Sequence, residues 1–131
     1  MTFCLRTGRI TIFRSTLSVI GYPEFYRFLY NCKDRLLAIE PCAMNDPGSY
    51  AFAGVKKDDV YDIGSTDLIR MLYRDNGWNE EISYRVPGRT FPNEQIVEFD
   101  LTSALAIIDG KVQESDVAVD SDTEEDDTTE I

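Results

Sequence analysis

The sequence predicts a mainly β, α+β fold built from two similar strand-helix-strand-strand units, followed by a disordered acidic C-terminal tail. Three observations support this prediction. Short β-branched and aromatic runs alternate with turn residues, one order of elements occurs twice, and apolar patterning is lost near the C-terminus. Of the 131 residues, 43% are hydrophobic and 28% are charged. This composition is typical of one globular domain or two very small ones.

The first unit is expected in residues 1–42, in the order strand, helix, strand, turn, strand. β-branched or aromatic residues indicate the strands, and polar residues indicate the turn. In chain order the elements are the strand 9–13, the helix 17–20, the strand 24–30, the turn 31–35 and the strand 36–39, which Pro41 stops. Ser15 or Thr16 would cap the helix through a hydroxyl, and Gly21 would end it by taking a positive φ.

The second unit is expected in residues 60–108 and repeats that order. Its helix has one apolar face, formed by residues at i, i+1, i+4 and i+5 spacing: Leu68, Ile69, Leu72 and Tyr73. In chain order the elements are the strand 60–63, the cap at Ser65 or Thr66, the helix ending at Gly77, the strand 82–86, breaks at 87–88 and 92–93, and the strand 96–99. Hydroxyl caps and terminal glycines are common in unrelated helices, so chance is the alternative explanation for the parallel.

Two further segments complete the predicted organisation. Residues 43–59 contain Asn-Asp-Pro-Gly-Ser and are expected to form a loop or linker. Residues 109–131 hold ten acids against one lysine and no aromatic residue, so this tail is expected to be disordered. It would serve as a solubilising segment, an electrostatic shield or a bait for a basic partner. The net charge of −11 therefore lies mostly in the tail, whereas residues 1–42 hold six bases against three acids.

The residues that the chain lacks exclude several function classes. Without histidine, there is no imidazole for acid–base chemistry, for a catalytic triad or for metal binding. Three cysteines without CxxC spacing predict neither a disulfide framework nor a zinc site, and they fit a reducing cytosol: Cys4, Cys32 and Cys42. No apolar run is long enough for a membrane span, and no signal peptide is indicated. We therefore expect a cytoplasmic protein that is not an enzyme and needs no cofactor or metal.

One segment resembles a known family. It consists of residues 8–12 (GRITI), the short helix with its Gly21, and the two strands that end in LLAIEP. It resembles the AbrB/SpoVT-like swapped-hairpin family of bacterial and archaeal DNA-binding regulators and antitoxins, over about residues 6–41 and with a weaker echo in 60–100. Family modules normally intertwine as dimers, so two units in one chain would form a swapped-hairpin-like pseudo-dimer.

The resemblance includes one match to the family pattern, at Ile20-Gly21-Tyr22, and two departures from it. Phe13-Arg14 stands where a proline is usual, and Ile20-Gly21-Tyr22 occupies the position of Leu-Gly-Ile. Pro23-Glu24 replaces the Pro-Gly-Asp turn.

The resemblance implies that basic side chains of the N-terminal strand and its loops grip DNA. The candidates by position are Arg6, Arg9 and Arg14, and the alternative is that they are solvated surface arginines. Residues 9 and 14 would face opposite ways in an unbroken strand. The leading hypothesis is a small, non-catalytic transcriptional regulator or antitoxin-like DNA-binding protein of bacterial or phage origin, with a homodimer as one oligomeric state open to it.

A second hypothesis is an acidic protein-interaction module, such as a phage-type inhibitor or a DNA-mimic-like binder of a basic nucleic-acid-handling protein. The second unit favours it, because acids occupy the approach to and start of its first strand: Asp58, Asp59 and Asp62. Complementary charge would raise the rate of encounter with a basic partner. Trp78, just beyond the helix-ending glycine, is the candidate anchor.

Overall fold

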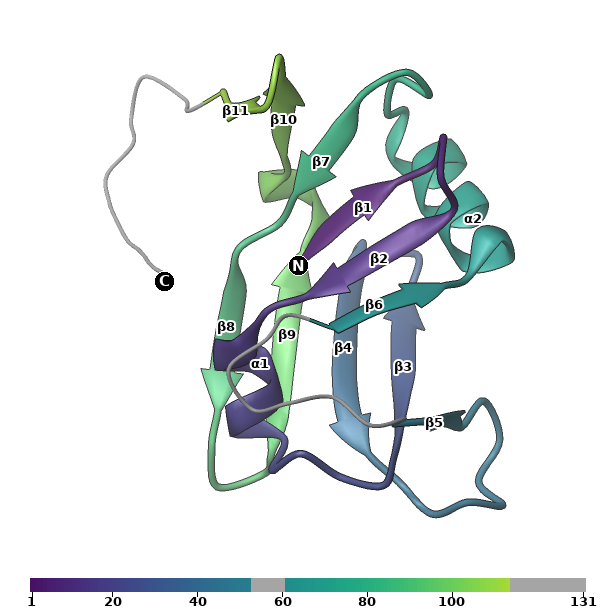
Figure 1. Ribbon diagram of the computed structural model, residues 1–131, viewed down its shortest axis with the longest axis vertical. Coiled ribbons are helices and arrows are strands. Elements are labelled where there is room, and N and C mark those ends of the chain that lie inside the picture. Colours follow the sequence, from purple (N-terminus) through teal and green to yellow (C-terminus); the bar gives the residue numbers. More distant parts are fainter. Residues whose placement is uncertain (53–60, 114–131) are drawn as a thin grey trace.

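The computed structural model describes residues 1–52 and 61–113. Two antiparallel sheets face each other across the core (Figure 1). The strands of the first sheet are β1 (Thr2–Cys4), β2 (Arg9–Ile12), β6 (Tyr61–Gly64), β7 (Ser83–Arg85), β10 (Leu105–Ile108) and β11 (Lys111–Val112). Those of the second are β3 (Phe25–Asn31), β4 (Leu36–Pro41), β5 (Tyr50–Ala51), β8 (Gly88–Phe91) and β9 (Ile96–Asp100). The helices are α1 (Arg14–Val19), α2 (Thr66–Asn76) and the 3₁₀ helix η1 (Leu101–Ser103). The prediction of a mainly β fold is confirmed.

The strand order brings distant parts of the chain side by side. It is β11-β10-β7-β1-β2-β6 in the six-stranded sheet and β5-β3-β4-β9-β8 in the five-stranded sheet. The chain passes from one sheet to the other between β7 and β8, at the fully buried Val86. Backbone hydrogen bonds between Met1 and Val86 in both directions hold this crossing against the start of the chain.

Alternating side chains give each sheet one core face and one outer face. In β2, Ile10 and Ile12 are fully buried, whereas Arg9 is exposed and Thr11 is half-buried. The buried side chains of both sheets and both helices form one cluster. Since α1 and α2 contribute to this shared core, neither helix covers the outer face of a sheet in the part of the chain that the structure describes. These two outer faces are the surfaces on which function can be sought.

The two helices end in the same way. A glycine at positive φ follows each helix, and its N–H donates to the carbonyl of the residue three positions earlier in the chain. The aromatic residue after the glycine donates its N–H to the carbonyl of the residue five positions earlier. The bonds are Gly21 to Ser18 (3.1 Å) and Tyr22 to Leu17 (3.1 Å), then Gly77 to Arg74 (3.4 Å) and Trp78 to Tyr73 (3.0 Å). Only glycine takes this left-handed conformation without strain, so both predicted helix ends are confirmed. The apolar face of α2 is also confirmed, because Ile69, Leu72 and Tyr73 are buried.

The predicted helix caps are wrong. α1 begins at Arg14, with Phe13 as its N-cap residue, so Ser15 and Thr16 lie inside the first turn. The helix starts this early because the Leu17 N–H already reaches the Phe13 carbonyl at 3.1 Å. Ser65 does precede α2, but its hydroxyl makes no capping bond. It instead lies 3.1 Å from the hydroxyl oxygen of Tyr50.

Several boundaries also differ from the prediction. The breaks expected around 87–88 and 92–93 enclose a strand, β8, which pairs with β9. Gly88 permits this pairing, because a Cβ there would lie 2.8 Å from side-chain atoms of Phe99 and Val97. Part of the expected linker forms β5, which pairs with β3, while 53–60 lies outside the described residues. The expected tail begins with a turn and β11 at 109–113, so regular structure continues past 108, and 114–131 lies outside the described residues.

Candidate functional site

The outer face of the six-stranded sheet gathers arginine and hydroxyl side chains. The register aligns Arg85 with Thr2, Thr2 with Thr11, and Thr11 with Asp62 in one row across β7, β1, β2 and β6. Two residues along the strands, Cys4 pairs with Arg9. We call this surface the arginine face and define it by its members: Thr2, Cys4, Arg9, Thr11, Asp62, Ser83 and Arg85. Its members supply two cations, one carboxylate, three hydroxyls and a thiol.

Arg9, one of the predicted DNA-binding residues, projects from this face. Its side chain is 63% exposed, and its guanidinium lies 4.0 Å from the Asp62 carboxylate. The Thr11 hydroxyl donates to the same carboxylate at 2.6 Å. An exposed pair at this distance is weak, because water screens it. Arg9 can therefore exchange Asp62 for a phosphate at small cost.

Two more arginines, Arg14 and Arg85, lie near the other end of β2. β2 ends at Ile12 and Arg14 opens α1, so strand alternation does not decide the direction of Arg14. The Arg85 guanidinium lies 4.7 Å from the centre of the Phe13 ring, a cation–π contact that brings it to this same end. Four residues of extended chain separate Arg9 from Phe13, or about 13 Å. Arg9 thus lies at the start of β2, and Arg14 and Arg85 lie near its end.

Arg6, the third predicted DNA-binding residue, lies in the turn between β1 and β2, beyond the edge of the arginine face. It lines a hollow of about 570 Å³ together with Glu81 and Asp109. The other residues of the lining are Ile82, Ser83, Ile107, Ile108 and Gly110. The two acids reduce the positive potential around Arg6, so Arg6 contributes less to the binding of an anion than Arg9 does.

The thiol of Cys4 is the titratable group on the arginine face with a shifted pKa. Burial acts to raise the pKa of this thiol, but hydrogen bonds from Ser83, Thr7 and the backbone of Arg6 outweigh it and hold the pKa below its ordinary value. Cys4, Cys32 and Cys42 are all free. The described residues contain no group of three or more Cys, Asp or Glu side chains placed to hold a metal ion.

Trp78 lies in an aromatic cluster that closes one end of the core. Its ring stacks on Tyr84 at 4.8 Å and meets Tyr73 edge-on at 5.2 Å and Phe3 at 5.9 Å. At its centre, the Tyr73 hydroxyl lies within hydrogen-bond distance of Phe3, Leu5 and Ile82. Burial raises the pKa of Tyr73 to about 12. Trp78 is therefore half-buried among side chains of its own chain, and its role as a partner anchor stays a prediction.

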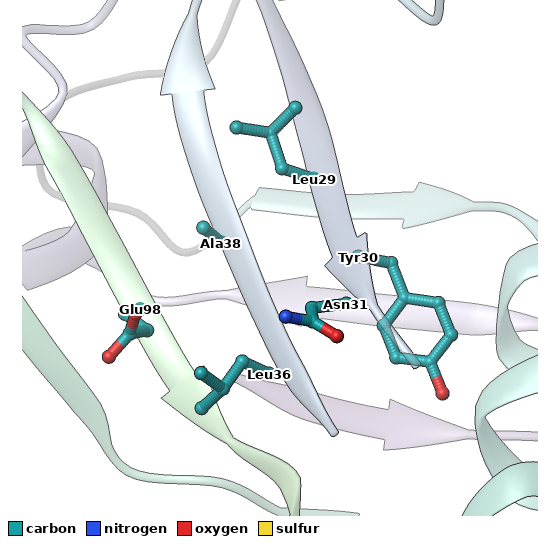
Figure 2. A pocket seen from close by; sticks show the side chains of 6 residues that line it. All are labelled: Leu29, Tyr30, Asn31, Leu36, Ala38 and Glu98. Carbon is teal, nitrogen blue, oxygen red and sulfur yellow. The ribbon is translucent and has the colours of Figure 1, made fainter. Parts of the chain in front are cut away.

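The outer face of the five-stranded sheet has a different character. A hollow of about 260 Å³ is lined by Leu29, Tyr30, Asn31, Leu36, Ala38 and Glu98. Figure 2 shows Leu29, Leu36, Ala38 and Glu98 spread across three neighbouring strands, with the ring of Tyr30 turned away from Leu29. The Tyr30 hydroxyl donates to Asp75 of α2 at 2.8 Å, and burial followed by this bond raises the pKa of Tyr30 to about 12. The lining of this hollow combines the apolar Leu29, Leu36 and Ala38 with the polar Asn31 and one carboxylate, Glu98.

Sequence reasoning named Arg9 but missed Arg85, which lies on the same face. The alternation of Ser83, Tyr84 and Arg85 would have placed the first and third of them on one face. Only the pairing of β7 with β1 shows that this face continues the outer face of β2.

No helix in the described part of the chain is both long and apolar enough to cross a membrane. Comparison with family models, curated proteins and solved structures gives no match for this chain.

Proposed function

We propose that this chain is a small, non-catalytic DNA-binding protein that contacts the phosphate backbone through its arginine face. One observation carries the proposal: in a molecule with an excess of acids, Arg9 and Arg85 lie on one outer sheet face beside hydroxyl side chains, and the exposed Arg14 follows directly after β2 at the start of α1. Arginine and hydroxyl groups supply most protein contacts to phosphate oxygens. The presence of one carboxylate, Asp62, confines the binding region to β7, β1 and β2.

The expected binding is modest and dependent on salt. Each phosphate that an arginine neutralises releases counterions, and about three contacts give a slope near −3 in a plot of log K against log salt. Residues 114–131 contain nine acids and no base, which oppose the approach of DNA. We therefore expect the full chain to bind duplex DNA only at low salt and removal of 114–131 to strengthen the binding.

We infer in addition that the fold consists of two related units, the first from β2 to β4 and the second from β6 to β9. Their helices end in identical bonding patterns at Gly21 and Gly77. Corresponding strands pair with each other, β2 with β6 and β4 with β9, as they would about a two-fold axis. The units differ in the length of their helices, six residues in α1 and eleven in α2. They also differ because the second unit divides its middle strand into β7 and β8 on different sheets. This arrangement supports the resemblance to swapped-hairpin regulators.

The experiment compares two double variants of the full chain for binding to a 24-base-pair duplex across a salt series. Arg9→Ala with Arg85→Ala should abolish most of the binding and reduce the magnitude of the slope of log K against log salt by about 2. Arg70→Ala with Arg74→Ala removes the same charge from exposed positions on α2 and should change little. Equal losses in both variants would contradict the proposal. So would an absence of binding at low salt, both in the full chain and after removal of 114–131.

A further inference from the structure

We propose that the outer face of the five-stranded sheet is a docking surface for a basic protein, which inserts a long cationic side chain between Leu29, Leu36 and Glu98. This face lies on the other sheet from the arginine face. Its partner is of a different class from DNA. The two proposals therefore rest on separate residues and can fail separately.

The centre of the docking surface is apolar. Leu29 is 43% exposed, although large apolar side chains are usually covered in a folded protein. The register places Leu29 directly opposite Ala38, and Leu36 lies next to them on β4 across the hollow of about 260 Å³ (Figure 2). Covering this strip would remove apolar area from water, which favours association.

Glu98 supplies the negative charge beside this strip. It lies opposite Ala38 across β4 and β9, and it is the charged residue among those that line the hollow. Arg89 is its cross-strand neighbour on β8, but the Arg89 guanidinium lies over the Phe91 ring, 5.2 Å from the ring centre. None of the ion pairs between described residues includes Glu98.

The other carboxylate near the centre of this face already has a partner. Glu40 accepts a hydrogen bond of 2.7 Å from Arg27, and both side chains of this pair are largely covered. The contact raises the pKa of Arg27 above its ordinary value. Asp100, opposite Leu36 on β9, is exposed, and one of its oxygens accepts from the N–H and the hydroxyl of Thr102. Glu98 is the carboxylate that lines the hollow, and it has no hydrogen-bond or ion-pair partner among the described residues.

Lysine and arginine match this chemistry because each has an apolar stem and a cationic head. The stem would lie on Leu29 and Leu36 while the head reaches Glu98. A second copy of the chain is a poor occupant, since each copy carries a net charge of −11. The same charge steers a basic protein toward the surface and raises its rate of association.

The test uses the full chain and a fluorescent ten-residue peptide of alternating arginine and leucine, with an alternating glutamate and leucine peptide as control. Because the acids of 114–131 also attract the basic peptide, two variants with the same loss of charge are compared. Glu98→Gln should weaken binding about tenfold, the effect of losing one charge-assisted contact. Glu94→Gln, in the exposed turn between β8 and β9, should weaken it less than twofold. Leu29→Ser should also weaken it, and the backbone amide signals of Leu29, Ala38 and Glu98 should shift in NMR spectra when peptide is added.

Three outcomes would overturn the proposal: equal losses for Glu98→Gln and Glu94→Gln, peptide-induced shifts that avoid β3, β4 and β9, or a dimer in sedimentation experiments that Leu29→Ser dissociates. The first would assign binding to general charge and the last would assign the face to a second copy. The double variant Arg9→Ala with Arg85→Ala should keep full affinity for the peptide. Conversely, Glu98→Gln should keep full affinity for duplex DNA, so each proposal is tested without the other.

Discussion

Replacing Tyr73 by phenylalanine removes one oxygen that joins three parts of the chain. The hydroxyl accepts from the Leu5 N–H at 3.3 Å and can donate to the Ile82 carbonyl at 2.6 Å or the Phe3 carbonyl at 3.1 Å. Tyr73 itself is only 2% exposed. A buried polar group that loses its partner costs about 1–3 kcal/mol. Since Leu5 and Ile82 lie where water can partly replace the hydroxyl, we expect the free energy of unfolding to fall by about 2 kcal/mol.

The assay is urea unfolding followed by fluorescence of Trp78, the single tryptophan, and by circular dichroism. Tyr84→Phe is the matched control. It removes a hydroxyl from the same cluster that accepts one exposed hydrogen bond, from the Asn79 N–H at 3.0 Å, and should cost less than about 1 kcal/mol. If Tyr73→Phe lowered the free energy of unfolding no more than Tyr84→Phe does, the Tyr73 hydroxyl would not join β1 to the start of β7.

Two further predictions concern the same core. In the folded chain the pKa of Tyr73 is about 12, whereas an unfolded tyrosine titrates near 10, so the unfolded state alone releases this proton between those values. Stability should therefore be complete below pH 10 and fall by up to about 1.4 kcal/mol per pH unit above it. Urea midpoints at pH 9 and 11 should show a smaller fall in Tyr73→Phe, and an equal fall would contradict this assignment. Gly88→Ala should cost about 1–3 kcal/mol, because its Cβ would lie 2.8 Å from Phe99 and Val97. Gly64→Ala, where the nearest atom would be 3.9 Å away, should be nearly neutral, and a thermal midpoint as low as that of Gly88→Ala would refute the packing argument.

The sequence predicts the parts of the fold that follow from local patterning. The alternation in residues 9–13, the spacing of Ile69, Leu72 and Tyr73, and the two glycines each depend on a few neighbouring residues, and the structure confirms them. The short strands β1, β5, β10 and β11 have two to four residues each. They form because a partner strand distant in sequence is present, and such pairing has no local signal.

The candidate sites show the same limit. Arg9 and Arg14 could be named because one opens a predictable strand and the other follows it. Arg85 joins Arg9 on one face only through pairing of residues more than eighty positions apart, Thr2 with Arg85. Leu29 and Glu98 likewise lie on one face only because β4 pairs with both of their strands. Alternation says that a residue faces outward, but the strand order decides which outward residues become neighbours.

The two outer faces carry opposite chemistry, and this has a consequence for how binding at one affects the other. We propose anion binding by Arg9 and Arg85 on one sheet, and binding of a cationic, partly apolar partner by Leu29 and Glu98 on the other. A basic partner on the five-stranded sheet would offset part of the net charge of −11 that repels DNA from the whole molecule. Binding of the partner should therefore strengthen binding of DNA, and thermodynamic linkage requires the reverse as well. Because this coupling acts through long-range charge, it should weaken steeply as salt rises and the screening length shortens.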